Sequence, residues 1–120
     1  MEITIKNGQI IKFVDNDITE IDDRFLERNK TLTKLVMDNL THMGNYCFRL
    51  NENIASLNLP QLTHIGDYCF KLNENIASLN LPQLTHMGDG CFYWNKNLTS
   101  LNLPQLTYIG NRCFYHNKTI

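Results

Sequence analysis

Hydrophobic and polar residues alternate along this chain in a pattern that returns every 22 residues. The pattern fits five consecutive copies, at residues 10–31, 32–53, 54–75, 76–97 and 98–119. The third and fourth copies are identical at 17 of 22 positions, and the first copy is the most degenerate. One such unit cannot bury its apolar side, but stacked units can, because each column of side chains packs on its own copies. The pattern therefore predicts a solenoid.

Within each copy the pattern predicts a short strand followed by turns. Residues 57–59, Leu-Asn-Leu, alternate between apolar and polar and should stack about 4.8 Å from their copies in a parallel sheet. Pro60 ends the strand, because proline cannot donate to a ladder. We expect Gly66 to permit a turn at positive φ, and Asp67 is typical of a helix N-cap. A short helical turn through residues 69–70 should follow on the outer side.

The two ends of the chain differ from the repeats between them. At the N-terminus, residues 3–5 alternate and Asn7-Gly8 is a hairpin signal, so residues 1–9 should form a hairpin strand that caps the array. At the other end Ile120 is the first residue of a sixth copy, with no atypical closing unit. We interpret residues 1–120 as a single domain and as a fragment of a longer array, or one whose end another chain covers. A homodimer through the C-terminal edge is a further expectation.

The repeated pattern Leu-x-x-Leu-x-Leu-Pro-x-Leu-Thr-x-Ile-Gly-x-x-Cys-Phe-x-x-Asn resembles the BspA-like class of leucine-rich repeats over residues 10–119. Two departures are visible, because Cys occupies the usual Ala position and Asn occupies the usual Cys position. The resemblance implies an α/β fold: a right-handed solenoid with a parallel sheet on the concave face and short helical turns on the convex face. It also implies binding of other macromolecules, often on surface adhesins or secreted effectors, and it does not imply catalysis.

Composition narrows the function classes. Hydrophobic residues make up 42% of the chain, charged residues 19%, and the formal net charge is −1. No basic excess is present to neutralise phosphates, so nucleic acid is not an expected partner. No apolar run reaches the roughly 18 residues of a membrane span, so membrane insertion is not expected either. Neither a Gly-rich phosphate loop nor a Ser-His-Asp set is identifiable, so we expect no enzyme and no cofactor.

Two columns of residues have a structural interpretation. Cysteines occur once per repeat, at Cys47, Cys69, Cys91 and Cys113, without the close pair typical of zinc sites. We interpret them as a buried, reduced column, with a disulfide or a metal as the alternatives. The compartment is unknown, but a cytoplasmic or secreted-effector location fits four free thiols better than a disulfide-forming compartment. The asparagines of the second column should bury amides that bond backbone groups in the loops; they are Asn29, Asn51, Asn73, Asn95 and Asn117.

Candidate binding residues fall into three sets. His42, His64 and His86 share one repeat position, which Tyr108 occupies in the last copy. Stacking would place these imidazoles roughly 5 Å apart, and the column is open to three interpretations: a solvated ladder, a strip that contacts a partner, or a metal site that we do not expect. The second set consists of Asn58, Asn80 and Asn102, which follow the outward side of the strands where solenoids usually dock.

The third set consists of the aromatic residues that distinguish the later copies, Tyr93, Trp94 and Tyr115. Trp and Tyr are enriched in interface hot spots, so these residues are candidates for partner contact. The alternative is that Trp94 packs beneath its own turn, because single apolar residues near a surface are common.

Two functional hypotheses follow from these observations. The first is a non-catalytic module that binds another protein. The second is a structural or adhesive spacer array that self-associates. The differences between the third and fourth copies include positions 68/90, 71/93 and 72/94, which lie on one side of the repeat and favour recognition.

Overall fold

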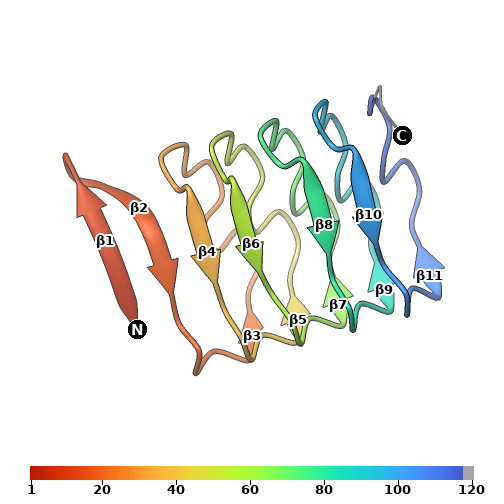
Figure 1. Cartoon of the computed structure of the whole chain (residues 1–120), viewed down its shortest axis with the longest axis horizontal. Helices are drawn as coiled ribbons and strands as arrows, with labels where there is room; N and C mark the ends of the chain where they lie inside the picture. Colours follow the sequence, from red (N-terminus) through yellow and green to blue (C-terminus); the bar gives the residue numbers. More distant parts are fainter. Residues whose placement is uncertain (118–120) are drawn as a thin grey trace.

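A computed structural model describes residues 1–117 as a stack of repeats in which each copy contributes two short strands (Figure 1). Residues 118–120, which include the end of the fifth copy and the start of the expected sixth, lie outside the described residues. The first strands of the copies are β2 (Gln9–Val14), β4 (Lys34–Val36), β6 (Ser56–Asn58), β8 (Ser78–Asn80) and β10 (Ser100–Asn102). The second strands are β3 (Glu20–Ile21), β5 (His42–Met43), β7 (His64–Ile65), β9 (His86–Met87) and β11 (Tyr108–Ile109).

Pairing between copies is parallel and in the register that the 22-residue period predicts. Leu35 pairs with Leu57 in one sheet, and His42 pairs with His64 in the other. At the N-terminus β1 (Glu2–Lys6) runs antiparallel to β2. The hairpin turn between them contains Asn7 and Gly8, whose φ angles are 52° and 74°. The predicted stack of parallel strands is therefore confirmed.

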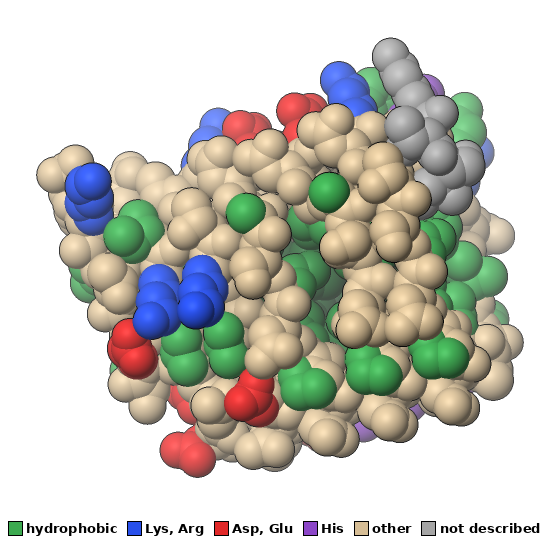
Figure 2. Space-filling view, in the orientation of Figure 1, with side chains coloured by type: hydrophobic (Ala, Val, Ile, Leu, Met, Phe, Trp, Pro, Cys, Tyr) green, Lys and Arg blue, Asp and Glu red, His purple; other side chains and the backbone are tan. Residues whose placement is uncertain are grey.

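The two sheets differ in continuity. The second strands form one five-stranded sheet, in the order β11-β9-β7-β5-β3. The first strands are divided into a sheet β1-β2-β4-β6 and a pair β8-β10, with no pairing between β6 and β8. Figure 2 shows a hollow floored by hydrophobic side chains at this place. Leu57 beside the split is half-buried, whereas Leu79 is only 2% exposed. The two strands have the same sequence, and nothing in it explains the split.

None of the described residues forms a helix, so the expected α/β class and the helical turns on the convex face were wrong. Residues 1–117 therefore contain no helix that could cross a membrane. Each copy instead has two residues with positive φ on its outer side, such as Tyr68 at 55° and Leu72 at 65°. These residues end any right-handed helical turn. The backbone N–H groups of Tyr68 and Phe70 donate to the next copy, to the carbonyls of Asp89 and Cys91 at 2.8 Å each. The molecule is a parallel-sheet β-solenoid.

The expected role of Gly66 was also wrong, because positive φ among the glycines occurs only at Gly8 and Gly90 of the described residues. Glycine is needed at Gly66 for close approach between copies. A Cβ there would lie 2.5 Å from the carbonyl oxygen of Gly44 and equally close to Oδ1 of Asn45. Asp67 does not cap a helix, and its Oδ1 accepts a hydrogen bond from the Asp89 backbone N–H at 2.8 Å.

The core consists of columns in which each residue stacks on its equivalent. Phe48, Phe70 and Phe92 are fully buried, and their ring centroids are 5.5 and 5.2 Å apart. Each such ring contributes about 1.5–3 kcal/mol through burial. All four cysteines are buried and free, so their predicted burial is confirmed.

The buried asparagine amides of this column form hydrogen bonds through their nitrogen atoms but, in four of them, not through their oxygen atoms. The Asn73 amide donates to the carbonyl of Phe48, and the Asn95 amide to that of Phe70, at 2.8 Å each. The predicted donation is therefore confirmed. The predicted acceptance is not found, because the Oδ1 atoms of Asn51, Asn73, Asn95 and Asn117 have no partner among residues 1–117.

Candidate functional site

The five-stranded sheet carries a column of rings on its exposed side. The strand register aligns Glu20, His42, His64, His86 and Tyr108 in succession. Neighbouring imidazole centroids are 4.4 Å apart in both pairs, with interplanar angles of 11° and 10°. The Tyr108 ring follows His86 at 5.9 Å, and this residue is 56% exposed. The structure thus brings the predicted histidine set together as one continuous stack.

A threonine before each histidine fixes the imidazole tautomer. The Thr63 hydroxyl donates to the carbonyl of Thr41 at 3.0 Å, and the same bond recurs from Thr85 to Thr63 at 3.1 Å. The single hydroxyl proton is then committed, so the contact between Thr63 Oγ1 and His64 Nδ1 at 2.9 Å requires the proton on Nδ1. The neutral ring is left with Nε2 as an acceptor for an external donor.

The histidine column is suited to hydrogen bonding and to sensing mild acid. Partial burial lowers the pKa of His64, and the neighbouring His42 and His86 lower it further. Near-parallel rings direct their Nε2 lone pairs side by side rather than toward one point. No group of three or more metal-ligating side chains suitable for an ion occurs within residues 1–117.

The asparagine set on the other sheet does not form a continuous ladder. The Asn102 amide donates to Oδ1 of Asn80 in the preceding copy at 2.8 Å, whereas the Asn58 amide donates to a carboxylate of its own preceding copy, Asp38 Oδ1, at 2.8 Å. Among the described residues no bond joins Asn58 to Asn80, because the sheet splits between them. All three residues are exposed, but they make two separate patches.

The aromatic set forms a cluster on the outer turns of the fourth and fifth copies, hereafter the aromatic cluster, which consists of Tyr93, Trp94, Tyr115 and His116. Tyr93 lies 5.4 Å from Tyr115 and 5.8 Å from Trp94 between ring centroids. His116 lies 3.9 Å from Trp94 and 4.2 Å from Tyr115. Tyr115 is 50% exposed, and Trp94 is half-buried against its neighbours. Tyr108 is not part of this cluster, because it belongs to the histidine column.

Three cations border the aromatic cluster. Lys71 Nζ lies 5.2 Å from the Tyr93 centroid, Lys96 Nζ lies 5.9 Å from that of Trp94, and Arg112 Cζ lies 5.9 Å from that of Tyr115. Lys96 also faces Glu74 at 3.9 Å. The surroundings of the rings are therefore polar, while the rings supply an apolar centre.

The cysteine column is a chain of buried thiols with uneven acidity. Burial raises the pKa of Cys91 well above its ordinary value. A hydrogen bond from Cys91, which outweighs burial, lowers the pKa of Cys113 to about 7. Each sulfur also donates to a glycine carbonyl, as Cys69 does to Gly44 at 2.7 Å and Cys113 to Gly88 at 2.9 Å. These contacts support a structural role.

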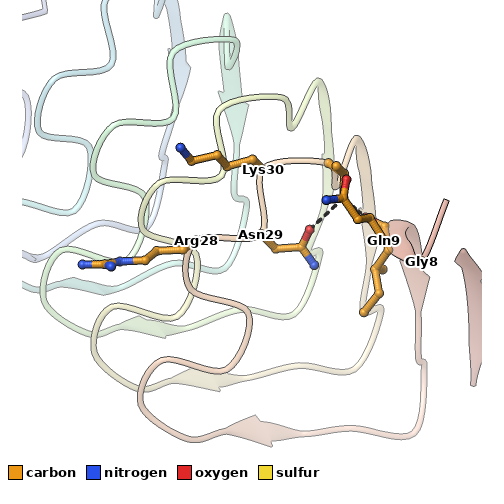
Figure 3. A pocket seen from close by; sticks show the side chains of 7 residues that line it. Gly8, Gln9, Arg28, Asn29 and Lys30 are labelled. Carbon is orange, nitrogen blue, oxygen red and sulfur yellow. Dashed lines mark hydrogen bonds between the residues drawn. The ribbon is translucent and has the colours of Figure 1, made fainter. Parts of the chain in front are cut away.

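Two cavities lie outside the columns. One, of about 420 Å³, is bordered by the hairpin turn and the first repeat. Figure 3 shows that Arg28 and Lys30 point away from Gly8 and Gln9, so the two cations are not directed at the hairpin turn. The second, of about 500 Å³, is lined by Tyr68, Asp89, Asn111 and Arg112 on the outer turns. Its lining combines an aromatic ring with a carboxylate, an amide and a guanidinium.

Several residues of these sites do not stand out in the sequence. The threonines that orient the histidines were visible as a repeated Thr-His pair, but the bond to the previous copy depends on the register. His116 occupies the repeat position of Leu72 and Trp94, but its contacts with Trp94 and Tyr115 depend on how the outer turns stack. The third copy has Tyr68 where the fourth has Gly90, and this difference is visible in the sequence. Its effect on the neighbouring side chains can be seen only in the structure.

The fold and these columns define a leucine-rich-repeat solenoid. The sequence profile described as a BspA type leucine rich repeat region, in six copies, matches residues 6–120. The chain therefore belongs to the BspA-type leucine-rich-repeat family. No curated protein and no solved structure matches it.

Proposed function

We propose that this chain is a non-catalytic module that recognises another protein through the aromatic cluster. Repeats of this family are commonly protein-interaction modules, which supports the general class. The observation that carries the assignment to this surface is the mutual contact of Tyr93, Trp94, Tyr115 and His116 on exposed turns. Trp and Tyr are the residues most enriched in binding hot spots.

The composition of the cluster favours a protein as the ligand over other macromolecules. An apolar centre of rings bordered by Lys71, Lys96 and Arg112 matches the anatomy of a protein interface, in which a polar rim surrounds an aromatic centre. The chain has a net charge of −1, which supplies little attraction for a nucleic-acid backbone. The histidine column and the asparagine patches are secondary candidates for the same partner.

The test compares protein capture by variants of the immobilised chain. The wild type and the Lys6→Ala control, at an exposed position of the N-terminal strand, should retain the same protein from an extract of the source cells, and Trp94→Ala or Tyr115→Ala should lose it. With that protein purified, calorimetry should give a Kd at least about tenfold weaker for Trp94→Ala. Equal affinity of both aromatic variants and the wild type would contradict docking at the cluster. The absence of any specifically retained protein would contradict recognition itself.

A second candidate function, the self-associating array, has its own supporting observation at the C-terminal edge. Leu101 and Ile109 are 38% and 47% exposed there, whereas their equivalents Leu79 and Met87 are buried. β10 and β11 are the outermost strands of their sheets, and open strand edges favour pairing with another chain. Under this proposal the described chain forms a homodimer through the C-terminal edge.

Sedimentation equilibrium tests this candidate. Re-burial of Leu101 and Ile109 stabilises an association by at most about 1.5–3 kcal/mol for each side chain, and pairing of the open strand edges adds backbone hydrogen bonds. We expect these contributions together to produce a dimer at high micromolar concentration. Leu101→Lys should shift it to monomer, whereas Ser78→Lys, at an exposed position of the same two-stranded sheet, should not. A wild-type monomer at high micromolar concentration would remove the support for self-association.

A further inference from the structure

One column on the outer turns has a missing member. The column consists of Arg24, Tyr46, Tyr68, Gly90 and Arg112, which are spaced 22 residues apart. All five residues have left-handed backbone conformations, with φ angles of 62°, 58°, 55°, 57° and 57°. Because the conformation is the same in each copy, successive side chains leave the backbone in the same direction. Glycine is the only member without a side chain.

The occupied part of this column shows what fits it. The Tyr46 ring lies between the Arg24 guanidinium, whose Cζ is 4.5 Å from the ring centroid, and the Tyr68 ring at 5.5 Å with an interplanar angle of 13°. A phenol ring is therefore held between a guanidinium on one side and an aromatic ring on the other. Both contacts are favourable, since a cation is attracted to a ring face and offset rings attract each other.

The column places the same two groups, a tyrosine ring and a guanidinium, in the copies on either side of Gly90. The Tyr68 ring leans over Gly90, where its Cδ1 and Cε1 take the space of a side chain. Tyr68, from the third copy, and Arg112, from the fifth, both line the cavity of about 500 Å³. The backbone is undisturbed, because Gly90 N–H donates to the Asn111 carbonyl at 2.8 Å as Tyr68 N–H does to Asp89. Gly90 thus removes a ring from the column and leaves its register intact.

We propose that this cavity binds an aromatic side chain of the partner protein, stacked between Tyr68 and the Arg112 guanidinium. The proposal rests on the proposed function of protein recognition and names the residue of the partner that anchors it. The inserted ring would lie between a tyrosine ring and a guanidinium, as Tyr46 lies between Tyr68 and Arg24. A tyrosine is the reference ligand, because a tyrosine occupies the filled position.

The remaining lining favours a neutral ring over an anion. One carboxylate, Asp89, and one guanidinium, Arg112, leave the cavity without net charge. Asp89 Oδ1 accepts the Asn111 backbone N–H at 2.9 Å, and Oδ2 is the second acceptor of this carboxylate. That oxygen is an acceptor for a phenol O–H or a backbone N–H of the partner. A phosphorylated or sulfated ring would place its charge beside the carboxylate.

The cavity adjoins the aromatic cluster, so one partner can contact both. Arg112 is close to the Tyr115 ring as well as to the cavity, and Lys71 Nζ lies 5.5 Å from the Tyr68 centroid and 5.2 Å from that of Tyr93. Interfaces commonly concentrate their binding energy in a few anchors that fill pockets. The inserted ring is such an anchor, and the cluster contacts the residues around it.

The test uses p-cresol as the probe, with 4-methylcyclohexanol as a non-aromatic control of similar shape. Amide chemical shifts are followed during titration of the full chain. With the wild type, p-cresol should shift the signals of Gly90 and Arg112. In Gly90→Tyr, the new ring fills the cavity from within and the affinity for p-cresol should fall at least about tenfold. Tyr46 and Tyr68 already hold the same backbone conformation, so the backbone accepts this variant, and the Tyr68 ring must turn aside to admit the new side chain.

Two matched arginine variants test the proposal even if the Gly90→Tyr variant does not fold. Arg112→Gln removes the guanidinium wall and should weaken p-cresol binding about threefold. Arg24→Gln, at the equivalent position in the first copy, should leave the affinity unchanged. Equal shifts in the wild type and Gly90→Tyr, equal effects of the two arginine variants, or equal binding of 4-methylcyclohexanol would each overturn the proposal.

The purified partner separates this inference from the proposed function. If Trp94→Ala loses the partner while Gly90→Tyr binds it as the wild type does, the anchor is wrong and protein recognition stands. If p-cresol binds as expected but no protein depends on Trp94 or Tyr115, protein recognition at the cluster fails, and with it the assignment of the ring to a protein partner.

Discussion

Replacing Gly66 with alanine tests the steric explanation of the glycine column. The added methyl carbon would lie 2.5 Å from Gly44 O and 2.6 Å from Gly44 C, where ordinary contacts begin near 3.4 Å. The two copies would have to separate by roughly 1 Å, and overpacking of this kind costs about 1–3 kcal/mol. The separation also strains two bonds, from Gly66 N–H to Met43 O at 2.9 Å and from Asp67 N–H to Asn45 Oδ1 at 2.8 Å.

The expected loss of unfolding free energy for Gly66→Ala is then about 2–6 kcal/mol, because each weakened hydrogen bond adds about 0.5–1.5 kcal/mol. Urea unfolding followed by circular dichroism measures it. The matched control is Gly8→Ala, where φ is 74° and no atom lies within 4 Å of the new methyl group. That change should cost only the left-handed backbone penalty of about 1–2 kcal/mol.

Asparagine distinguishes the steric explanation from a conformational one. Asn tolerates left-handed backbone better than other residues with side chains, so Gly8→Asn should be milder than Gly8→Ala. Gly66→Asn should be at least as damaging as Gly66→Ala, since the obstacle is the neighbouring backbone. The reasoning is refuted if Gly66→Ala stays within about 0.5 kcal/mol of the wild type, or if Asn restores stability at Gly66.

Three further predictions concern the histidine, cysteine and asparagine columns. Burial and neighbouring imidazoles lower the pKa of His64, so the unfolded chain binds a proton there more readily than the folded chain. The melting temperature should therefore fall as the pH drops below about 6.5. His64→Gln should reduce this dependence in thermal scans from pH 8 to 5. The four cysteines should react slowly with iodoacetamide until the chain is denatured, and Cys113, with a pKa of about 7, should react first by mass spectrometry; rapid native labelling of all four would contradict their burial. Asn73→Asp places a carboxylate beside the Phe48 carbonyl and should cost about 3–5 kcal/mol in urea unfolding, whereas Asp at exposed Asn75 should cost under about 0.5 kcal/mol.

The sequence predicted the columns of this fold well, because a fixed period assigns every residue to its neighbours above and below. The Leu35–Leu57 pairing and the burial of Cys69 followed directly from it. The helix prediction failed because Asp67 and the residues after it match a helix start locally. Their backbone donors bond the next copy instead, as Phe70 N–H bonds the Cys91 carbonyl, and no local signal reports that competition.

For the candidate site, the sequence predicted which residues share a column but not how their side chains are oriented. The period placed His42, His64 and His86 in one column, but the side of the ring that carries the proton depends on the Thr63 hydroxyl and on the bond that it makes to Thr41. The period also placed Tyr108 at the histidine position of the last copy, and the strand register and the contact of its ring with His86 confirm this. The split between β6 and β8 separates identical strands, so no comparison of their residues predicts it.

The contrast between Gly66 and Gly90 indicates where this fold tolerates a functional site. At Gly66 the adjacent backbone occupies the space of a side chain, so the position cannot vary without separating the copies. At Gly90 the neighbouring contact is a tyrosine ring, and the backbone bond to Asn111 is the same as that from Tyr68 to Asp89. Side chains on the outer turns can therefore change while the ladder of backbone bonds holds the shape. A change of one residue in such a column alters the surroundings of both neighbours, which is how a nearly uniform repeat acquires one distinct cavity.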